Sequence, residues 1–214
     1  MFIKICGCRR PQDVTAAARA GADAVGMILA PGHRRSLEVE EAARLRQAVP
    51  AGVLAVGVFL DQSLEEVRAA ALAIGCDAVQ LHGRESEAYC AALRADFPLI
   101  RAWSLGTATP VAADWILVEP HAGRSGGSGT PWDWSRACGL DLQAPLLLGG
   151  GLNPANVAGA CDAARPFGVD VSSGVEVDGH KDPSRISLFC EAVRRWEEGS
   201  ALRDAAGEAA LRER

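Results

Sequence analysis

The feature that most constrains the fold is the alternation of short apolar runs with longer, alanine-rich amphipathic segments along the 214-residue chain. The apolar runs predict strands, and most are continuous rather than alternating with polar residues. Parallel strands covered by helices have this composition. The eight predicted strands are residues 2–6, 24–29, 54–60, 78–81, 99–105, 115–119, 145–148 and 169–172.

The amphipathic segments predict helices at residues 11–20, 37–48, 63–74, 85–95, 154–164 and 183–198, with a short one at 134–138. Residues 106–113 are too few for a full helix. The third helix has the clearest ends: Ser63 is a favourable N-cap, and Glu65 and Glu66 follow in the first turn, where the helix dipole favours acids. Gly75 stands in the usual C-terminal glycine position.

Eight strand–helix units in roughly 200 residues predict a single-domain α/β fold, the (β/α)8 TIM barrel. The alternative is a doubly wound open sheet, which usually has fewer strands and a glycine-rich turn after the first. Here that turn is Gly7-Cys8-Arg9-Arg10, which is not a dinucleotide-binding fingerprint. We therefore expect residues 1–198 to form the barrel and residues 199–214 to form a polar tail, frayed or helical.

Composition excludes several classes of protein. The net charge of −5 gives no basic surface for nucleic acid. The seven cysteines form no disulfide framework, which favours a reducing compartment. The opening MFIKICG is not a signal peptide, and no apolar run is long enough to span a membrane. We expect a cytoplasmic protein that binds neither nucleic acid nor membrane.

Polar side chains and glycines gather at the carboxyl ends of the predicted strands, where barrels of this kind form their active sites. Two glycine-rich turns follow the seventh and eighth strands. Their backbone amides could surround a phosphate group, or they could be tight turns that need glycine only for geometry. The candidate site residues are Cys6, Arg35, Gln80, His82, Glu119, Gly150, Gly151, Asp170, Ser172 and Ser173.

Each of these side chains also has an ordinary structural explanation. Cys6 could be a base or nucleophile, or a small core residue. Gln80 and His82 share one face of a strand, as ligands or as satisfied core groups. Glu119 ends the apolar run ILVE, either as a strand terminus reaching solvent or as a catalytic acid. No histidine or cysteine pair has metal-ligand spacing, so no metal site is expected.

Motifs along most of the chain resemble, in order, those of the phosphoribosylanthranilate isomerase family. The resemblance runs from about residue 2 to residue 196, and the combination of KICG, QLHG and DVSSGVE is its most specific part. The motifs are KICG at 4–7, GADAVGMI at 21–28, VGVF at 56–59, VQLHG at 79–83, GGSG at 126–129, WDW at 132–134, GGLNPANV at 150–157 and VDVSSGVE at 169–176.

The resemblance implies a step of tryptophan biosynthesis, the Amadori rearrangement of N-(5′-phosphoribosyl)anthranilate to 1-(2-carboxyphenylamino)-1-deoxyribulose 5-phosphate, without a cofactor. It implies that Cys6 is the general base and that Arg35 meets the anthranilate carboxylate. Asp170 lies near the substrate amine or hydroxyls, with Gln80 and His82 as further substrate ligands. The implied phosphate-binding residues are Gly150, Gly151, Ser172 and Ser173. We expect a monomer or a homodimer.

Two departures from the family pattern bear on function. The family's general acid is an aspartate seven residues before the GG(S/T)G motif, and here that position is Glu119. The extra methylene displaces the carboxyl group, and a misplacement of about 1 Å can cost ~100-fold in rate. The usual serine after the second strand is absent from His33-Arg34-Arg35. Two alternatives stay open: a paralogue that isomerises a related aminosugar phosphate, and a non-catalytic barrel that binds a sugar phosphate.

Overall fold

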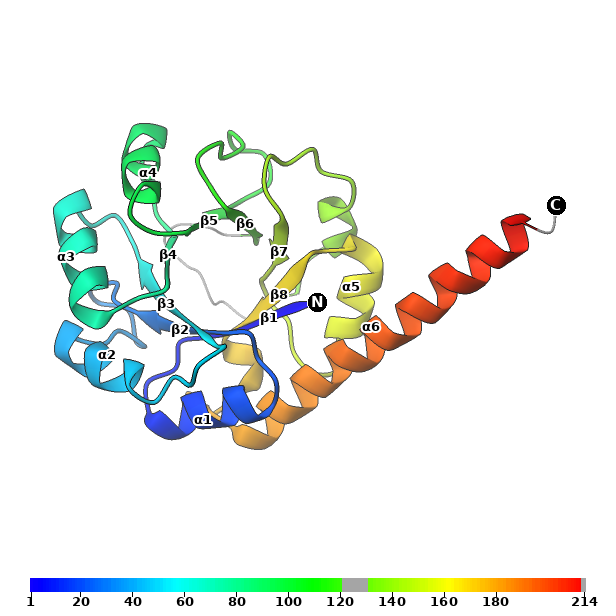
Figure 1. The fold of residues 1–214 in the computed structure, drawn as a ribbon, viewed down its shortest axis with the longest axis horizontal. Coiled ribbons are helices and arrows are strands. Elements are labelled where there is room, and N and C mark those ends of the chain that lie inside the picture. The colour runs from blue at the N-terminus through cyan, green and yellow to red at the C-terminus, as the bar shows by residue number, and fades with distance from the viewer. Residues whose placement is uncertain (121–130, 213–214) are drawn as a thin grey trace.

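The computed structural model describes residues 1–120 and 131–212, with side chains up to residue 200. Within this part of the chain, eight parallel strands close into a barrel in sequence order (Figure 1). The strands are β1 (Phe2–Cys6), β2 (Ala24–Ile28), β3 (Leu54–Phe59), β4 (Ala78–Leu81), β5 (Leu99–Trp103), β6 (Trp115–Val118), β7 (Leu146–Leu148) and β8 (Gly168–Val171). The predicted (β/α)8 barrel is confirmed.

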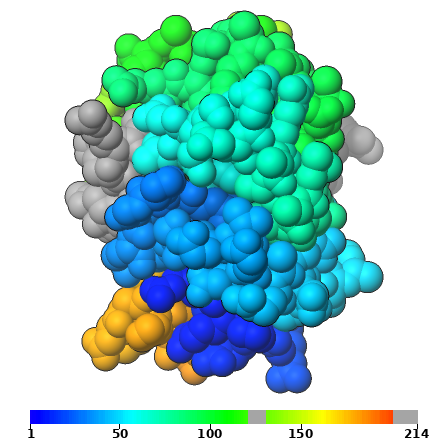
Figure 2. Space-filling view, turned by 90° about the vertical axis from the view of Figure 1, so that its left-hand side faces the viewer, coloured from blue at the N-terminus to red at the C-terminus, as the bar shows by residue number. Residues whose placement is uncertain are grey.

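Helices lie around the outside of the barrel, and Figure 2 shows the outer surface formed mainly by the segment from α2 to α4. Residues 104–114, between β5 and β6, form turns and bends rather than a helix, as predicted. The helices are α1 (Pro11–Arg19), α2 (Val39–Arg46), α3 (Leu64–Ile74), α4 (Glu87–Arg94), α5 (Val157–Ala164) and α6 (Pro183–Arg212), with short 3-10 helices η1 (Trp134–Ala137) and η2 (Ser173–Val175).

The last helix is longer than the predicted 183–198. It continues through residue 212 and projects away from the barrel (Figure 1). A small antiparallel hairpin precedes it, formed by β9 (Glu176–Val177) and β10 (His180–Lys181), which sequence analysis did not predict. This hairpin brings Glu176 and Lys181 back towards the end of β8.

Local sequence signals explain the ends of α3. The Ser63 side chain accepts a hydrogen bond from the Glu66 backbone N–H, while the Glu66 carboxylate accepts one from the Ser63 N–H. This reciprocal pair satisfies two of the N–H groups that a helix start leaves free. Gly75 ends the helix with φ +76°, in the left-handed region that glycine adopts without a steric penalty.

Two apolar layers hold the barrel together. Inside it, small and branched side chains from alternate strand positions pack against each other, including Ala24, Val56, Ala78, Ile100 and Leu117. A larger layer, between the strands and the surrounding helices, contains most of the remaining buried apolar residues. Because alternate residues of a strand point to opposite faces, strands β1 to β7 supply side chains to both layers.

Three aspartates form hydrogen bonds between strands at the amino-terminal end of the barrel. Asp23, Asp77 and Asp114 each precede a strand and accept a hydrogen bond, 2.8 Å long, from a backbone N–H of the strand before it. These hydrogen bonds stabilise the amino-terminal end of the barrel. Active sites of such barrels form at the opposite, carboxyl-terminal end of the strands. No helix of the described residues is long and apolar enough to cross a membrane.

Candidate active site

A cavity opens at the carboxyl ends of the barrel strands. All of the residues predicted for the site line it, although they come from six separate segments of the chain. They are Cys6, Arg35, Gln80, His82, Glu119, Gly150, Gly151, Asp170, Ser172 and Ser173. The side walls are apolar and include Ile28, Val58 and Leu152. The GGSG motif at 126–129, predicted to belong to this end of the barrel, lies outside the described residues.

Cys6 shares the inner face of β1 with Lys4. Lys4 is fully buried, and its Nζ donates a hydrogen bond to Asp170 Oδ1 at 2.8 Å. Gly26, on the neighbouring strand, leaves room for both side chains, because a Cβ there would lie 2.8 Å from Cys6 Sγ and 3.2 Å from Lys4 Nζ. Lys4, Cys6 and Asp170 therefore form one buried polar cluster in the floor of the cavity.

Burial and charge act in opposite directions on the Cys6 thiol. Burial raises its pKa above the ordinary value, while the positive charge and hydrogen bond of Lys4 partly offset this effect. Burial by itself would lower the pKa of Lys4, but the negative charges of Asp170 and of a Cys6 thiolate raise it. Lys4 therefore stays charged, and it favours the thiolate form of Cys6.

Across the cavity, His82 follows β4 and Glu119 follows β6, each extending its strand by one backbone hydrogen bond. His82 Nε2 lies 2.6 Å from Glu119 Oε1, and both side chains are largely buried. On the other side of the ring, His82 Nδ1 lies 3.3 Å from Gln80 Nε2. Burial alone would lower the pKa of His82, but the hydrogen bond and charge of Glu119 outweigh burial and raise it.

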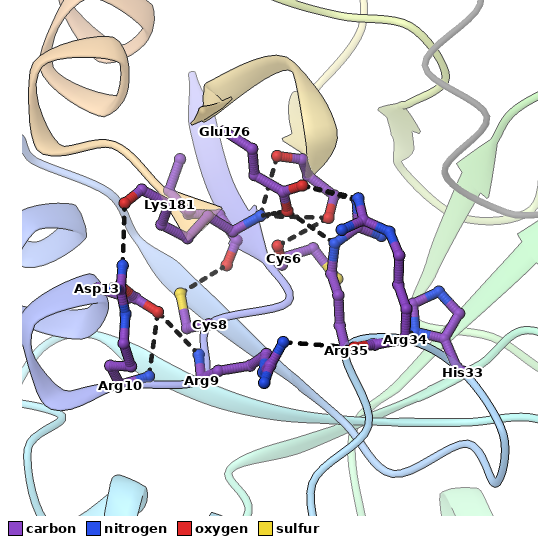
Figure 3. A network of polar contacts seen from close by, with 12 residues as sticks. Cys6, Cys8, Arg9, Arg10, Asp13, His33, Arg34, Arg35, Glu176 and Lys181 are labelled. Carbon is purple, nitrogen blue, oxygen red and sulfur yellow. Dashed lines mark hydrogen bonds and ion pairs between the residues drawn. The ribbon is translucent and has the colours of Figure 1, made fainter. Parts of the chain in front are cut away.

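Arg35 is buried beside the cavity and is held by a carboxylate of the β9–β10 hairpin (Figure 3). Its Nε and Nη2 donate to Glu176 at 2.7 Å and 3.0 Å, which is the bidentate geometry suited to a guanidinium and a carboxylate. Arg34 Nη2 and Lys181 Nζ each donate to the same carboxylate at 2.7 Å. Three cations therefore converge on one acid.

These contacts determine the ionisation of the groups around Arg35. Burial would raise the pKa of Glu176, but hydrogen bonds from Arg35 and Lys181 lower it to about 2. Burial and the charges of the two arginines lower the pKa of His33, whose Nδ1 accepts a hydrogen bond from the Arg35 backbone N–H. This corner of the cavity therefore carries a net positive charge at neutral pH.

The turn after β7 has glycines where the backbone requires them. Gly150 has φ +81°, and a Cβ at this position would lie 2.5 Å from Cδ of Pro120. Two indole groups hold the turn from one side: Trp132 Nε1 donates to the Gly149 carbonyl at 3.0 Å, and Trp134 Nε1 to the Gly150 carbonyl at 3.3 Å. The WDW motif thus packs against the turn after β7.

The turn after β8 is equally close-packed. A Cβ on Gly174 would lie 1.8 Å from the carbonyl oxygen of Leu152, so the two glycine-rich turns touch here. Ser172 Oγ donates to the Cys6 carbonyl at 3.0 Å, and Lys181 Nζ donates to the Ser172 carbonyl at 2.9 Å. These bonds connect the end of β8 to the base of the site.

Sequence analysis did not single out Lys4, Glu176 or Lys181. Lys4 had a signal, because it is a charged residue in an apolar strand, two positions before Cys6 and therefore on the same face. Glu176 is the last residue of the motif VDVSSGVE at 169–176, but no contact was predicted for it. Lys181 reaches the site only through the unpredicted hairpin. Within the described residues, no group of three His, Cys, Asp or Glu side chains is placed to hold a metal ion.

Comparison with known proteins adds an independent observation. Residues 3–192 match the family described as N-(5'phosphoribosyl)anthranilate (PRA) isomerase. A protein named N-(5'-phosphoribosyl)anthranilate isomerase from Desulforudis audaxviator is 40% identical over 176 residues, which cover 78% of this chain and 85% of the relative. A protein of the same name from Chromohalobacter salexigens is 43% identical over 77% of this chain and 80% of the relative.

Solved structures agree with the sequence comparison. The phosphoribosyl anthranilate isomerase of Thermotoga maritima superimposes with a TM-score of 0.82 at 35% identity, covering 91% of this chain and 98% of that one. The enzyme of the same name from Thermus thermophilus gives 0.80 at 32% identity, covering 91% and 99%. A further similar structure, at 32% identity and a TM-score of 0.76, contains reduced 1-(o-carboxyphenylamino)-1-deoxyribulose 5-phosphate and covers 91% and 98%.

Proposed function

The chain belongs to the N-(5′-phosphoribosyl)anthranilate isomerase family, and we propose that its cavity performs this isomerisation with Cys6 as general base and Glu119 as general acid. The observation that carries the proposal is that one cavity collects a thiol, a carboxyl group and two glycine-rich turns from separate parts of the chain. An aminosugar phosphate rearrangement needs this combination: an acid, a base and a phosphate-binding end.

The first step is the opening of the ribose ring. Glu119 donates a proton to the ring oxygen, the bond from this oxygen to C1′ breaks, and the lone pair of the anthranilate nitrogen forms the C1′=N bond. The ring oxygen leaves as a hydroxyl group. Glu119 is suited to the step because its carboxyl group stands in a largely buried position at the cavity wall, where a positioned acid is most effective.

In the second step Cys6 removes the proton from C2′. The electrons of that C–H bond form the C1′=C2′ double bond, and the iminium nitrogen recovers its lone pair, which gives an enolamine. The enol then loses its hydroxyl proton while C1′ gains one, which yields the ketone. Lys4 supports the thiolate that this step requires, since it is a permanently charged neighbour of Cys6.

The remaining predicted residues bind the substrate in this proposal. The turns containing Gly150, Gly151, Ser172 and Ser173 receive the phosphate through backbone N–H groups and hydroxyls. Arg35 meets the anthranilate carboxylate, with Nη1 as the nitrogen that is not engaged by Glu176. Asp170 and Gln80 face the ribose hydroxyls or the amine. We further propose a cytoplasmic enzyme, monomeric or dimeric, with residues 1–198 as the catalytic domain.

Turnover of N-(5′-phosphoribosyl)anthranilate by the purified protein tests this proposal. Cys6→Ala and Glu119→Gln should each lower kcat by ~100-fold or more, because each removes one proton-transfer group. Cys138→Ala is the matched control, because Cys138 is an exposed thiol outside the cavity. Full activity in Glu119→Gln would exclude Glu119 as the acid, and an inactive wild-type protein would contradict the proposed substrate.

A further inference from the structure

The surroundings of Glu119 indicate that a second residue shares the proton of its carboxyl group. Among the described residues, three buried side-chain polar atoms make no aligned hydrogen bond, namely Gln80 Oε1, His82 Nε2 and Glu119 Oε1, although the last two lie 2.6 Å apart. All three belong to the row Gln80–His82–Glu119 along one wall of the cavity. Buried polar groups normally have a hydrogen-bond partner. Three buried atoms in one row without an aligned hydrogen bond therefore indicate a site where hydrogen bonds form and break during function.

The contact between His82 and Glu119 is short enough for a proton to be shared. Nε2 and Oε1 are 2.6 Å apart, although the ring N–H and the carboxylate oxygen are not aligned as an ordinary hydrogen bond. The two residues extend different strands, so the barrel itself fixes their distance.

Gln80 can serve either form of the imidazole. As placed, its Nε2 faces His82 Nδ1 at 3.3 Å, which suits a ring that carries its proton on Nε2 and donates it to a Glu119 carboxylate. With the amide turned by 180°, Oε1 accepts from an Nδ1–H, and Nε2 is then available to the carboxyl proton. Both amide orientations occupy the same position, because the amide oxygen and nitrogen are nearly equal in size. Each orientation therefore matches one proton state of the pair.

The charges that face His82 come from four elements. Glu119 after β6 and Asp170 on β8 favour a protonated imidazole, and Lys4 on β1 and His33 in the segment after β2 oppose it. Burial also opposes protonation, but the pKa of His82 is raised nevertheless. Burial is the largest single influence on the pKa of His82, but the hydrogen bond and charge of Glu119, with the charge of Asp170, together outweigh it.

We propose that His82 is a positioning residue that shares one proton with Glu119, so that the pair, rather than a lone carboxyl group, is the acid of the ring-opening step. The proposal rests on the proposed function. Before the step, the pair holds one exchangeable proton. Glu119 passes this proton to the ribose ring oxygen, which leaves a Glu119 carboxylate beside a neutral His82 imidazole. A proton from water restores the pair after the product leaves.

The pair also gives a physical reason for glutamate at this position. Shortening Glu119 to aspartate removes one methylene group and draws the carboxyl group back by about 1.5 Å. A contact of 2.6 Å would then open to a distance at which no hydrogen bond forms without a backbone shift. The departure from the family pattern is therefore coupled, in this proposal, to the position of His82.

The direct test is nitrogen-15 NMR of the histidine rings across a pH titration, with His82→Gln used to identify the His82 signals among the four histidines. We expect His82 to titrate above the ordinary histidine value in the wild-type protein. In Glu119→Gln and in Glu119→Asp its pKa should fall by about one unit or more, because the carboxylate is lost or displaced. An unchanged His82 titration in both variants would overturn the proposal.

Kinetics give the second readout. His82→Gln should lower kcat/KM at neutral pH by at least ~10-fold and shift one limb of its pH profile downwards by about one unit or more. His180→Gln is the matched control, since His180 is exposed on β10. A His82→Gln variant with a normal pH profile refutes the pair while leaving the isomerase intact. An inactive wild-type protein refutes the proposed function, and the NMR titration still decides whether the pair exists.

Discussion

Glu176→Gln should cost this protein much more stability than an ordinary surface substitution. The Glu176 carboxylate receives hydrogen bonds from Arg34, Arg35 and Lys181 at 2.7–3.0 Å, and its side chain is 6% exposed. Glutamine keeps the size of the side chain but removes the charge. Arg35 and Lys181, both buried, then lose the negative charge that offsets their own.

The pKa of Glu176 provides the magnitude. A fall from 4.5 in an ordinary glutamate to about 2 here corresponds to about 3.5 kcal/mol, at roughly 1.4 kcal/mol per pKa unit. Breaking a buried ion pair by removing one partner costs about 3–5 kcal/mol in other proteins. We therefore expect Glu176→Gln to lower the free energy of unfolding at pH 7 by about 3.5 kcal/mol.

The sign of the pH dependence follows from the same shift. Because the folded-state pKa lies below the unfolded one, the contribution of Glu176 is complete above about pH 4.5 and is lost as the pH falls towards 2. The difference between the wild-type protein and Glu176→Gln should therefore narrow across this range. Stability is measured by urea unfolding at a series of pH values, followed by circular dichroism.

The matched control is Glu191→Gln. Glu191 lies on α6, its side chain is 56% exposed, and its nearest cationic atom is Arg195 Nη2 at 3.6 Å. Exposed pairs contribute little, so we expect a change below about 0.5 kcal/mol. The reasoning is refuted if Glu176→Gln loses no more stability than Glu191→Gln, or if its deficit stays constant between pH 4.5 and 2.

Three further outcomes are expected. Cys6→Ser should lower kcat by ~100-fold or more with an unchanged circular dichroism spectrum, because a hydroxyl is a weaker base than a thiolate; normal turnover would contradict the assigned role. Gly174→Ala should destabilise the fold by about 1–3 kcal/mol in urea unfolding, since its Cβ meets the Leu152 carbonyl oxygen at 1.8 Å. Gly159→Ala, in α5 with no atom within 4 Å of the added Cβ, should be neutral or stabilise the fold by up to about 1 kcal/mol. Equal changes in stability for Gly174→Ala and Gly159→Ala would contradict the close packing at Gly174. Arg35→Lys should raise the KM for the anthranilate substrate by ~10-fold or more, with a smaller effect on kcat, because an ammonium group lacks the planar guanidinium that holds Glu176 through Nε and Nη2 and presents Nη1 to the substrate; an unchanged KM would show that the carboxylate binds elsewhere.

The barrel was predictable because its signals are local. Most of the eight apolar runs are continuous, and the spacing between them leaves room for helices between most of the strands, so the strand order follows from chain connectivity. The ends of α3 were equally readable, since Ser63, Glu66 and Gly75 act within a few residues of each other. The largest shift is at the end of α6, which was predicted at residue 198 and lies at residue 212.

The partners of the site residues were not predictable in the same way. The resemblance indicated Arg35 and Asp170 by their positions in the sequence. The contact of Arg35 with Glu176, however, depends on a hairpin whose two strands have two residues each, which is too short for a periodic sequence pattern. The pairing of Lys4 with Asp170 depends on closure of the barrel between β1 and β8. Contacts that cross the barrel are set by register and closure, and neither is visible in a local window of sequence.

The most direct test of the central claim is isomerisation of N-(5′-phosphoribosyl)anthranilate in deuterium oxide, with the product followed by proton NMR. Because Cys6 removes the C2′ proton and C1′ is then protonated from solvent, the account predicts one deuterium at C1′ of each product molecule as it forms. Turnover in Cys6→Ala, measured in parallel, should be nearly abolished. Product from the wild-type protein that retains only protium at C1′, as a direct hydrogen shift from C2′ would give, contradicts the account.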